Sequence, residues 1–342
     1  MADAPLTRSA FLRPAILAIW SRGQLAQWAS RAAASGITAA ITKLEVIAPE
    51  LRAVLADHGI TTVGAFACYS DHARQAPLPG TVRPVGADGR LLSGIEWYRG
   101  IVPGNDEYDD ALVDRLRAEA ERAEVGTILL DFARWPGHWE LESRADGHPR
   151  AASFDPQTMA RFADRIGRSA LTPHDILTEH RSEWADFRVD IISAITARLA
   201  REIRAAGAEP GVFLVPVRHR QRRADYGQDA VELAGSVSVF AIMAYQQMLA
   251  LSSADVLAMA DEVTSTTDAR VIAMTQITAD PAYAGRWDWG PPIDADELTA
   301  HLAVLDAATR EGRLHGLSYF PGEAPLPRTD FDAMPRLEGT LR

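Results

Sequence analysis

Asp131 stands where a strand-like apolar segment ends, and its position could support acid–base chemistry. The five residues before it, Gly126–Leu130, have the composition of a buried strand. Its carboxylate should emerge at the strand end, where partial burial and neighbouring charges can adjust its pKa for work as acid, base or nucleophile. Arg134 and Trp135 follow at once, and aromatic rings in polar clefts commonly stack on sugars. We predict that Asp131 is catalytic and that Arg134 and Trp135 contact the substrate; an ion pair of Asp131 with Arg134 that only fixes the turn is the alternative.

Other apolar segments of the chain also end in polar or aromatic side chains. Side chains at the ends of neighbouring parallel strands gather at one edge of a sheet, so these residues are candidates for the same site. The predicted substrate contacts among them are Trp20, Lys43, Arg218, His219, Tyr245, Gln246, Gln276 and Glu323. Glu45, just beyond the second segment, is a candidate carboxylate.

The elements that must position these residues are short apolar runs rich in β-branched residues, which alternate with amphipathic stretches. Continuous apolar content is typical of parallel strands buried on both faces. The pattern predicts a single (β/α)8 TIM barrel with its core at about residues 15–325 and its ligand site at the carboxyl ends of the strands. The eight expected strands are Ile16–Trp20, Ile37–Lys43, Ile60–Cys68, Gly126–Asp131, Val212–Val217, Val237–Tyr245, Val271–Ile277 and Leu317–Phe320.

An open doubly wound sheet would show the same alternation of strands and helices. Such sheets usually have five to seven strands, and Trp20–Gly23 stands where they carry a glycine-rich phosphate loop. Two long connections, Tyr69–Asn105 after the third strand and about Gly137–Ser182 after the fourth, are expected to be functional loops. Because no internal repeat or linker interrupts the pattern, we predict one domain over residues 1–342.

The composition excludes several classes of protein. The 342 residues are 47% apolar with a formal net charge of −11, which disfavours nucleic acid as a partner. A single cysteine allows neither an intrachain disulfide nor a thiolate metal site. The apolar run Ala15–Trp20 is too short for a signal-peptide core or a membrane span, so we expect a cytoplasmic protein without a membrane partner.

The segment Gly126–Pro136 resembles the "G-hydrophobic-L-D-aromatic-x-R-aromatic-P" element of bacterial glycoside-hydrolase-like TIM barrels, which are distantly related to α-amylase-type barrels. Trp184–Arg188, Asp225–Asp229 and Phe240–Tyr245 resemble further elements of that family in the same order. The chain departs from the family pattern at the sixth strand, where Ser238 or Val239 stands for an aspartate, Ile242 for a proline and Gln246 for a carboxylate. The resemblance implies cleavage of a glycosidic bond in an oligosaccharide, polysaccharide or glycoconjugate, with Asp131 as one catalytic acid.

Glycoside hydrolysis usually requires two carboxylates, and the second is not evident from the sequence. Strands five to seven end in Arg218-His219, Gln246 and Gln276, none of them acidic. We therefore predict Glu45 as general acid/base, with Glu323 as the next candidate and Asp131 as nucleophile or transition-state stabiliser. No cofactor is expected.

Other chemistries remain open at this point. A chitinase-like mechanism, in which the substrate's acetamido group assists a single acid, would explain the shortage of carboxylates, although Ala133 stands where those enzymes have a glutamate. A non-catalytic carbohydrate-binding barrel would need no acid pair. Lys43 could form an imine, and the histidines show no H-x-H or H-E-x-x-H metal motif. The basic run Arg218–Arg223 could recognise an anionic group on the saccharide.

Overall fold

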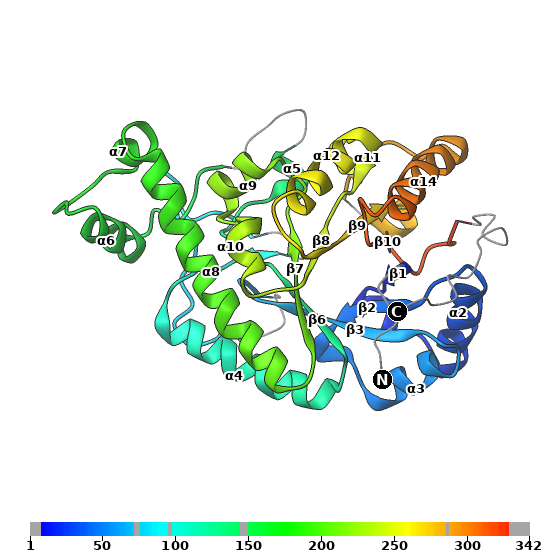
Figure 1. Ribbon diagram of the computed structural model, residues 1–342. Coiled ribbons are helices and arrows are strands. Elements are labelled where there is room, and N and C mark those ends of the chain that lie inside the picture. The colour runs from blue at the N-terminus through cyan, green and yellow to red at the C-terminus, as the bar shows by residue number, and fades with distance from the viewer. Residues whose placement is uncertain (1–7, 72–75, 95–97, 144–149, 285–286, 328–342) are drawn as a thin grey trace, which may run out of the picture.

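The computed structural model describes residues 8–71, 76–94, 98–143, 150–284 and 287–327 of the chain. Eight parallel strands close into a barrel in the order β1-β10-β9-β8-β7-β6-β3-β2, which confirms the predicted α/β TIM-barrel fold (Figure 1). Seven of the predicted strands match observed ones within a few residues. The barrel strands are β1 (Arg8–Phe11), β2 (Ala39–Lys43), β3 (Thr61–Ala67), β6 (Thr127–Asp131), β7 (Glu209–Leu214), β8 (Val239–Ile242), β9 (Arg270–Gln276) and β10 (Gly316–Phe320).

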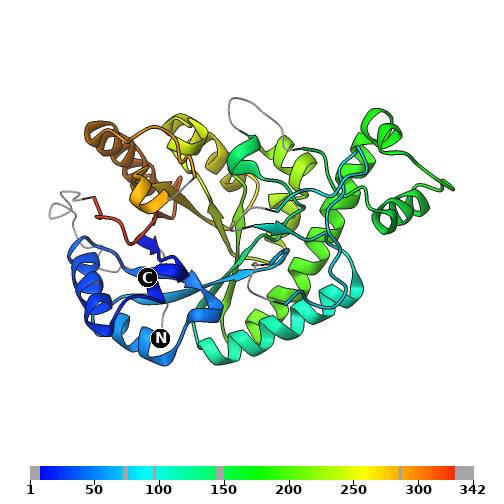
Figure 2. The ribbon, with the colours of Figure 1, turned by 180° about the vertical axis from the view of Figure 1, so that it is seen from behind.

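Helices surround the barrel on the outside, as both views of the ribbon show (Figures 1 and 2). Several begin with a side chain that accepts a backbone N–H of the first turn, such as Asn105 before α4 and Asp294 before α14. No helix among the described residues is long and apolar enough to cross a membrane. The longer helices are α2 (Arg22–Ala34), α3 (Pro49–Ala56), α4 (Asp106–Ala123), α6 (Pro156–Arg165), α8 (Arg181–Ala205), α9 (His219–Tyr226), α12 (Ser253–Thr264) and α14 (Ala295–Arg310). The shorter ones are α1 (Pro14–Leu17), η1 (Leu44–Val46), α5 (Trp139–Glu142), α7 (Pro173–Thr178), α10 (Ala230–Ala234), α11 (Gln246–Leu249) and α13 (Pro281–Ala284).

The first predicted strand, Ile16–Trp20, was wrong. The strand is Arg8–Phe11, which pairs with β2 on one side and β10 on the other. Pro14 instead begins the short helix α1, consistent with the preference of proline for the first helical turn. Ile19 is 74% exposed, so this apolar run is not a core strand. Trp20 consequently does not lie at a strand end.

Two long connections leave the carboxyl ends of β3 and β6. The first runs from Ala67 to Asp106 and contains the antiparallel pair β4 (Ser70–Asp71) and β5 (Arg99–Gly100). The second runs from Asp131 to Arg181 and contains α5, α6 and α7. In Figure 1, α6 and α7 project away from the barrel, beyond α8. That the whole chain forms one domain stays a prediction.

The apolar core consists of two separate clusters. The larger lies between the strands and the surrounding helices, and the smaller fills the inside of the barrel. In the inner cluster, the rings of Phe11 and Phe213 meet edge to face at 6.4 Å. A Cβ on Gly211 of β7 would come within 2.9 Å of the Val239 carbonyl oxygen and 2.4 Å of a Leu129 methyl group. The barrel wall is therefore packed too tightly for even one added methyl group at this position.

This packing generates a test of the barrel wall. Gly211→Ala should lower the free energy of unfolding by about 1–3 kcal/mol, because the neighbouring backbone cannot move away from the added methyl group. The control is Gly235→Ala at the end of α10, where the nearest atom to a new Cβ is at an ordinary 3.5 Å. Urea unfolding followed by circular dichroism measures both variants. Equal stabilities of the two would contradict the packing described.

Candidate active site

Asp131 ends β6, and its carboxylate is held at the barrel mouth by two partners. Its Oδ2 forms an ion pair with Nζ of Lys43, which ends β2, and its Oδ1 accepts the backbone N–H of Phe132 at 2.9 Å. The two side chains of the ion pair are only 12% and 10% exposed. Coulomb attraction is strong in such a poorly solvated place, so the carboxylate is fixed in orientation and its charge is balanced.

Phe132 has a backbone conformation that is unusual for a bulky residue. Its φ of +53° lies in the left-handed region, and such outliers concentrate at functional sites. The turn directs the Phe132 ring back over the site, where it stacks on Tyr98 at 5.1 Å and lies 5.0 Å from Nζ of Lys43. The strained turn thus brings an aromatic face next to the Asp131–Lys43 ion pair.

Glu140 on α5 is a second carboxylate close to Asp131. Burial raises its pKa to about 7; the attraction of Arg134 opposes this shift, and the negative charges of Asp131 and Glu142 add to it. A carboxyl group with such a pKa is partly protonated near neutral pH, as a general acid must be. Glu140 is not among the acids that the sequence predicted. The available signal was an acid beside Trp139 in the long connection after the fourth strand.

Aromatic side chains form a continuous wall beside the two carboxylates. Tyr245 lies 5.6 Å from Trp139 and stacks on Phe320 at 4.6 Å, and Phe320 lies 5.2 Å from Trp289. Burial raises the pKa of Tyr245 well above its usual value, and the charges of Asp131 and Glu140 raise it further. The predicted contact Tyr245 is therefore close to both acids.

Arg134 and Trp135, predicted as substrate contacts, lie inside the protein. Arg134 is 1% exposed, and its Nη1 donates to the carbonyl of Gly137 at 2.9 Å. Trp135 is fully buried, packs against Trp184 and Phe187, and donates its indole N–H to a carbonyl of α8. Trp135 thus has no free face for a sugar ring.

The side-chain amide of Gln246 bonds the backbone of Gln276, and the side-chain amide of Gln276 bonds the backbone of the neighbouring connections. The side-chain oxygen of Gln246 accepts the N–H of Gln276 and the hydroxyl of Thr275, both at 2.9 Å. The amide of Gln276 accepts the Met248 N–H at 3.1 Å and donates to the Trp289 carbonyl at 2.9 Å. Both side chains are buried, so they fix the connections after β8 and β9 and have little left to offer a ligand.

The two acids predicted to assist Asp131 lie elsewhere. Glu45 is exposed on η1, where its charge raises the pKa of Glu119 of α4 after the larger effect of burial. Glu323, after β10, is buried in an ion pair with Arg13, whose guanidinium also lies over the Trp289 ring. The structure associates neither acid with Asp131.

Two arginines of the basic run after β7, Arg218 and Arg223, are paired with carboxylates of the protein itself. Arg218 pairs with Glu262 of α12 at 2.6 Å, and the backbone N–H of His219 donates to the same carboxylate. Arg223 pairs with both Asp186 and Asp229. These charges are therefore not reserved for an anionic ligand.

Trp20, the last predicted contact, is half-buried beside α2. Its ring lies 6.3 Å from that of Trp28, against the outer apolar cluster. It contributes to the packing of α1 and α2 on the barrel.

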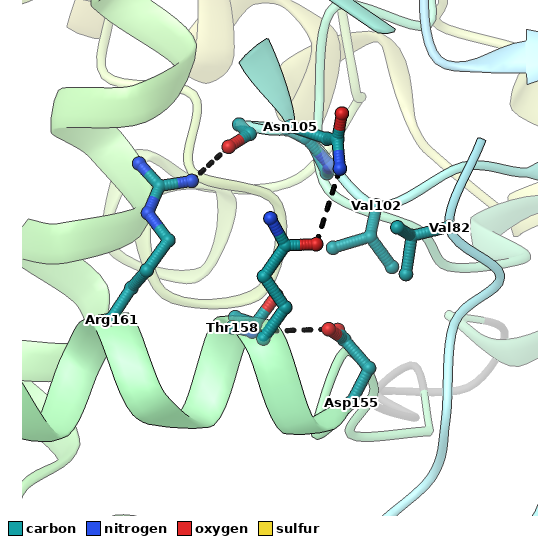
Figure 3. A pocket seen from close by; sticks show the side chains of 9 residues that line it. Val82, Val102, Asn105, Asp155, Thr158 and Arg161 are labelled. Carbon is teal, nitrogen blue, oxygen red and sulfur yellow. Dashed lines mark hydrogen bonds between the residues drawn. The ribbon is translucent and has the colours of Figure 1, made fainter. Parts of the chain in front are cut away.

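Two other kinds of site can be considered from the geometry. A small pocket lies between α6 and the connection that precedes α4, where Asn105 bonds Gln157 at 3.1 Å and Arg161 bonds the carbonyl of Gly104 (Figure 3). None of its lining residues belongs to the group around Asp131. Among the described residues, no three His, Cys, Asp or Glu side chains are grouped as a metal site would require.

Solved structures with the same barrel fold include several glycoside hydrolases. The glycoside hydrolase domain of PgaB from Bordetella bronchiseptica superimposes with a TM-score of 0.68 at 14% identity, over 93% of this chain and 94% of that one. The catalytic domain of β-amylase from Paenibacillus polymyxa gives 0.64 at 10% identity, over 92% of each chain. A chitinase from Chromobacterium violaceum gives 0.50 at 13% identity, over 94% and 95%. No protein-family model and no curated protein sequence matches the chain. The sequence resemblance is thus confirmed for the barrel fold.

The raised pKa of Glu140 predicts how stability depends on pH. Between the ordinary glutamate value of 4.5 and about 7 the folded protein keeps this proton while the unfolded chain loses it. Stability from this group is therefore fully present below pH 4.5 and is lost as pH rises through 7. The side chain in Glu140→Gln stays neutral. Across this window its free energy of unfolding should therefore rise relative to that of the wild type by on the order of 1–3 kcal/mol.

Urea unfolding at pH 4.5, 6 and 8 measures this difference. The control is Glu121→Gln at an exposed position of α4, whose effect should not grow with pH. A difference between Glu140→Gln and wild type that stays constant over the whole range would refute the burial effect.

Proposed function

We propose that the protein is a glycoside hydrolase in which Asp131 and Glu140 are the two catalytic carboxylates. The observation that carries the proposal is their contrast at the barrel mouth. Asp131 is paired with a lysine ammonium group, whereas burial raises the pKa of Glu140 to about 7. Two neighbouring carboxyl groups in opposite environments are suited to opposite roles in glycosidic cleavage.

Glu140 acts as the general acid in this proposal. Its proton passes to the glycosidic oxygen while the bond from the anomeric carbon to that oxygen breaks, and the electron pair of the bond stays on the leaving oxygen. Asp131, as a carboxylate, stabilises the positive charge that develops at the anomeric carbon or attacks it as nucleophile. A water molecule then adds its oxygen to the anomeric carbon and gives a proton back to Glu140, which also breaks the bond to Asp131 where Asp131 has attacked as nucleophile.

Glu140 replaces Glu45 as the proposed partner of Asp131. The charge of Asp131 acts on Glu140 and both charges act on Tyr245, whereas Glu45 faces α4. With a second carboxylate at hand, the proposal no longer requires the acetamido group of the substrate.

The substrate class is a saccharide. Support comes from Phe320, which is half-buried and packs on the buried rings of Tyr245 and Trp289 beside the acids, since sugar rings present apolar faces to such rings. Support also comes from the fold shared with proteins described as a glycoside hydrolase domain, a β-amylase and a chitinase. We propose no anionic group on the saccharide, because Arg218 and Arg223 are paired within the protein. The cytoplasmic location stays a prediction.

One observation favours a second candidate, a carbohydrate-binding barrel without catalysis. Nζ of Lys43 forms an ion pair with Oδ2 of Asp131. That oxygen cannot attack as a nucleophile while the pair persists. Binding without turnover, measured by isothermal titration calorimetry with the saccharides used in the activity assay, would support this candidate.

Activity assays on paired substrates test the proposal. Asp131→Asn should lower kcat by about 10²–10⁴-fold on oligosaccharides, and Glu140→Gln by a similar factor, as expected for loss of a general acid. On an aryl glycoside with a good leaving group, which hardly needs protonation, Glu140→Gln should be much less impaired than Asp131→Asn.

Glu45→Gln is the control, and its kcat should stay within about twofold of wild type because an exposed carboxylate with an ordinary solvated environment contributes little to general acid–base catalysis. The assay uses a panel of gluco-, xylo- and N-acetylglucosamine-based oligosaccharides and the matching aryl glycosides. Loss of turnover in Glu45→Gln with full activity in Glu140→Gln would reverse the assignment of the acid.

A further inference from the structure

Arg134 is a buried arginine, and the proposed glycosidic cleavage does not by itself require an arginine at this position. Arg134 lies in the turn between Asp131 and Glu140, and its guanidinium carbon is 4.9 Å from the ring centroid of Tyr98. The rings of Phe132 and Tyr226 are both 5.5 Å away. Three aromatic faces compensate part of the cost of removing this cation from water.

The hydrogen bonds of Arg134 are incomplete. Nη1 donates to the carbonyls of Trp135 and Gly137, at 3.3 and 2.9 Å. Nε and Nη2 are buried and donate to no group among the described residues. Buried donors without a partner are rare, and charged ones are the most costly. The N–H groups of two nitrogens of this cation, Nε and Nη2, are thus available for an anion on this side of the mouth.

Glu140 is the acid on which Arg134 acts most strongly. After burial, the attraction of Arg134 has the largest effect on the pKa of Glu140, and its direction is downward. Gly137, whose carbonyl Arg134 holds, precedes the first residue of α5 by two positions. The same side chain therefore fixes the turn before α5 and bears on the carboxyl group that α5 carries.

We propose that Arg134 is a positioning residue for Glu140: it fixes the turn from which α5 starts, and its free N–H groups are the counter-ion of the carboxylate that Glu140 becomes. The second part rests on the proposed function, in which the proton of Glu140 passes to the glycosidic oxygen. That transfer leaves a negative charge on Glu140, and Nε and Nη2 of Arg134 can donate to it. Arg134 thereby keeps the acid able to give its proton away in a poorly solvated place.

Other titratable groups face this pair and remain unchanged in the variants below. They come from the ends of β2 and β6, the connection before α4, the turn around α5, the end of α9 and the connection after β8. These groups are Asp131, Tyr98, His138, Glu142, Tyr226 and Tyr245, together with Lys43 as the ion-pair partner of Asp131. A difference between Arg134 variants therefore reports the arginine itself.

The test follows the titration of Glu140 in the full chain without ligand. Glutamate labelled with ¹³C at its carboxyl carbon gives NMR signals, and the one that disappears in Glu140→Gln belongs to Glu140. Arg134→Gln, which removes the charge, should raise the titration midpoint above about 7 by about one pH unit, as expected for loss of an opposite charge. Arg134→Lys, which keeps the charge but not the planar fork, should leave the midpoint within a few tenths of a unit and lower kcat by about tenfold through misplacement.

Arg188 provides a matched control. It is likewise a buried arginine, lies 5.0 Å from the Trp135 ring and donates to the carbonyls of Ala224 and Asp225. Arg188→Gln should lower stability without moving the Glu140 midpoint. An unchanged midpoint in Arg134→Gln overturns the inference. If Arg134→Gln does not fold, Arg134→Lys decides. A Glu140 midpoint in that variant that differs from wild type by as much as one pH unit overturns the inference. A protein without any turnover would refute the proposed function, whereas the titration would still decide the role of Arg134.

Discussion

Closure of the barrel by eight parallel strands determines which side chains can meet at its mouth. β3 lies between β2 and β6, and its register sets Ala65 beside Lys43 and Ala67 beside Asp131. The buried Ala65 belongs to the inner cluster and is small, so the long side chain of Lys43 can reach across β3 to Asp131. The ion pair at the centre of the site is thus a consequence of strand order, register and one small residue.

The polar groups at the mouth do not account for the stability of the fold. Removing two charges from water costs about as much as their attraction returns, so a buried ion pair such as Lys43–Asp131 is weak evidence for stability. The apolar inner cluster beneath them and the larger cluster under the helices supply the burial that drives folding. The unpartnered donors of Arg134 and the raised pKa of Glu140 are further costs at this end of the barrel. Several energetically unfavourable features at one place in a structure are typical of a functional site.

The barrel and the strand-end residues of the site were predictable, because continuous apolar runs identify strands and a run's last residue lies at the mouth. Asp131 and Lys43 follow from this rule, whereas Tyr245 lies beyond the end of β8, directly before α11. Arg8–Phe11 escaped it because an arginine and a serine occupy half of that short strand, while the more apolar Ile16–Trp20 follows a proline and forms a helix and turn. Gln276 obeyed the rule in position and Gln246 lies just beyond its strand, but sequence cannot reveal that both side-chain amides bond backbone groups of the neighbouring connections. Trp135 faces the helix layer because the turn at Phe132 has a positive φ, which no periodicity indicates.

The second carboxylate depends on the path of a connection, and this is where inference from strand ends reaches its limit. Residues 132–142 turn at Phe132, are fixed by Arg134 and bring α5 back beside the residue from which they started. Folds of this class keep the barrel and vary the connections, so the chemistry differs where the sequence pattern is weakest. The scarcity of acids at the ends of strands five to seven therefore does not count against a hydrolase. One connection can supply both the acid and the cation that holds it, provided that its first turn is tight enough to bring it back over the mouth.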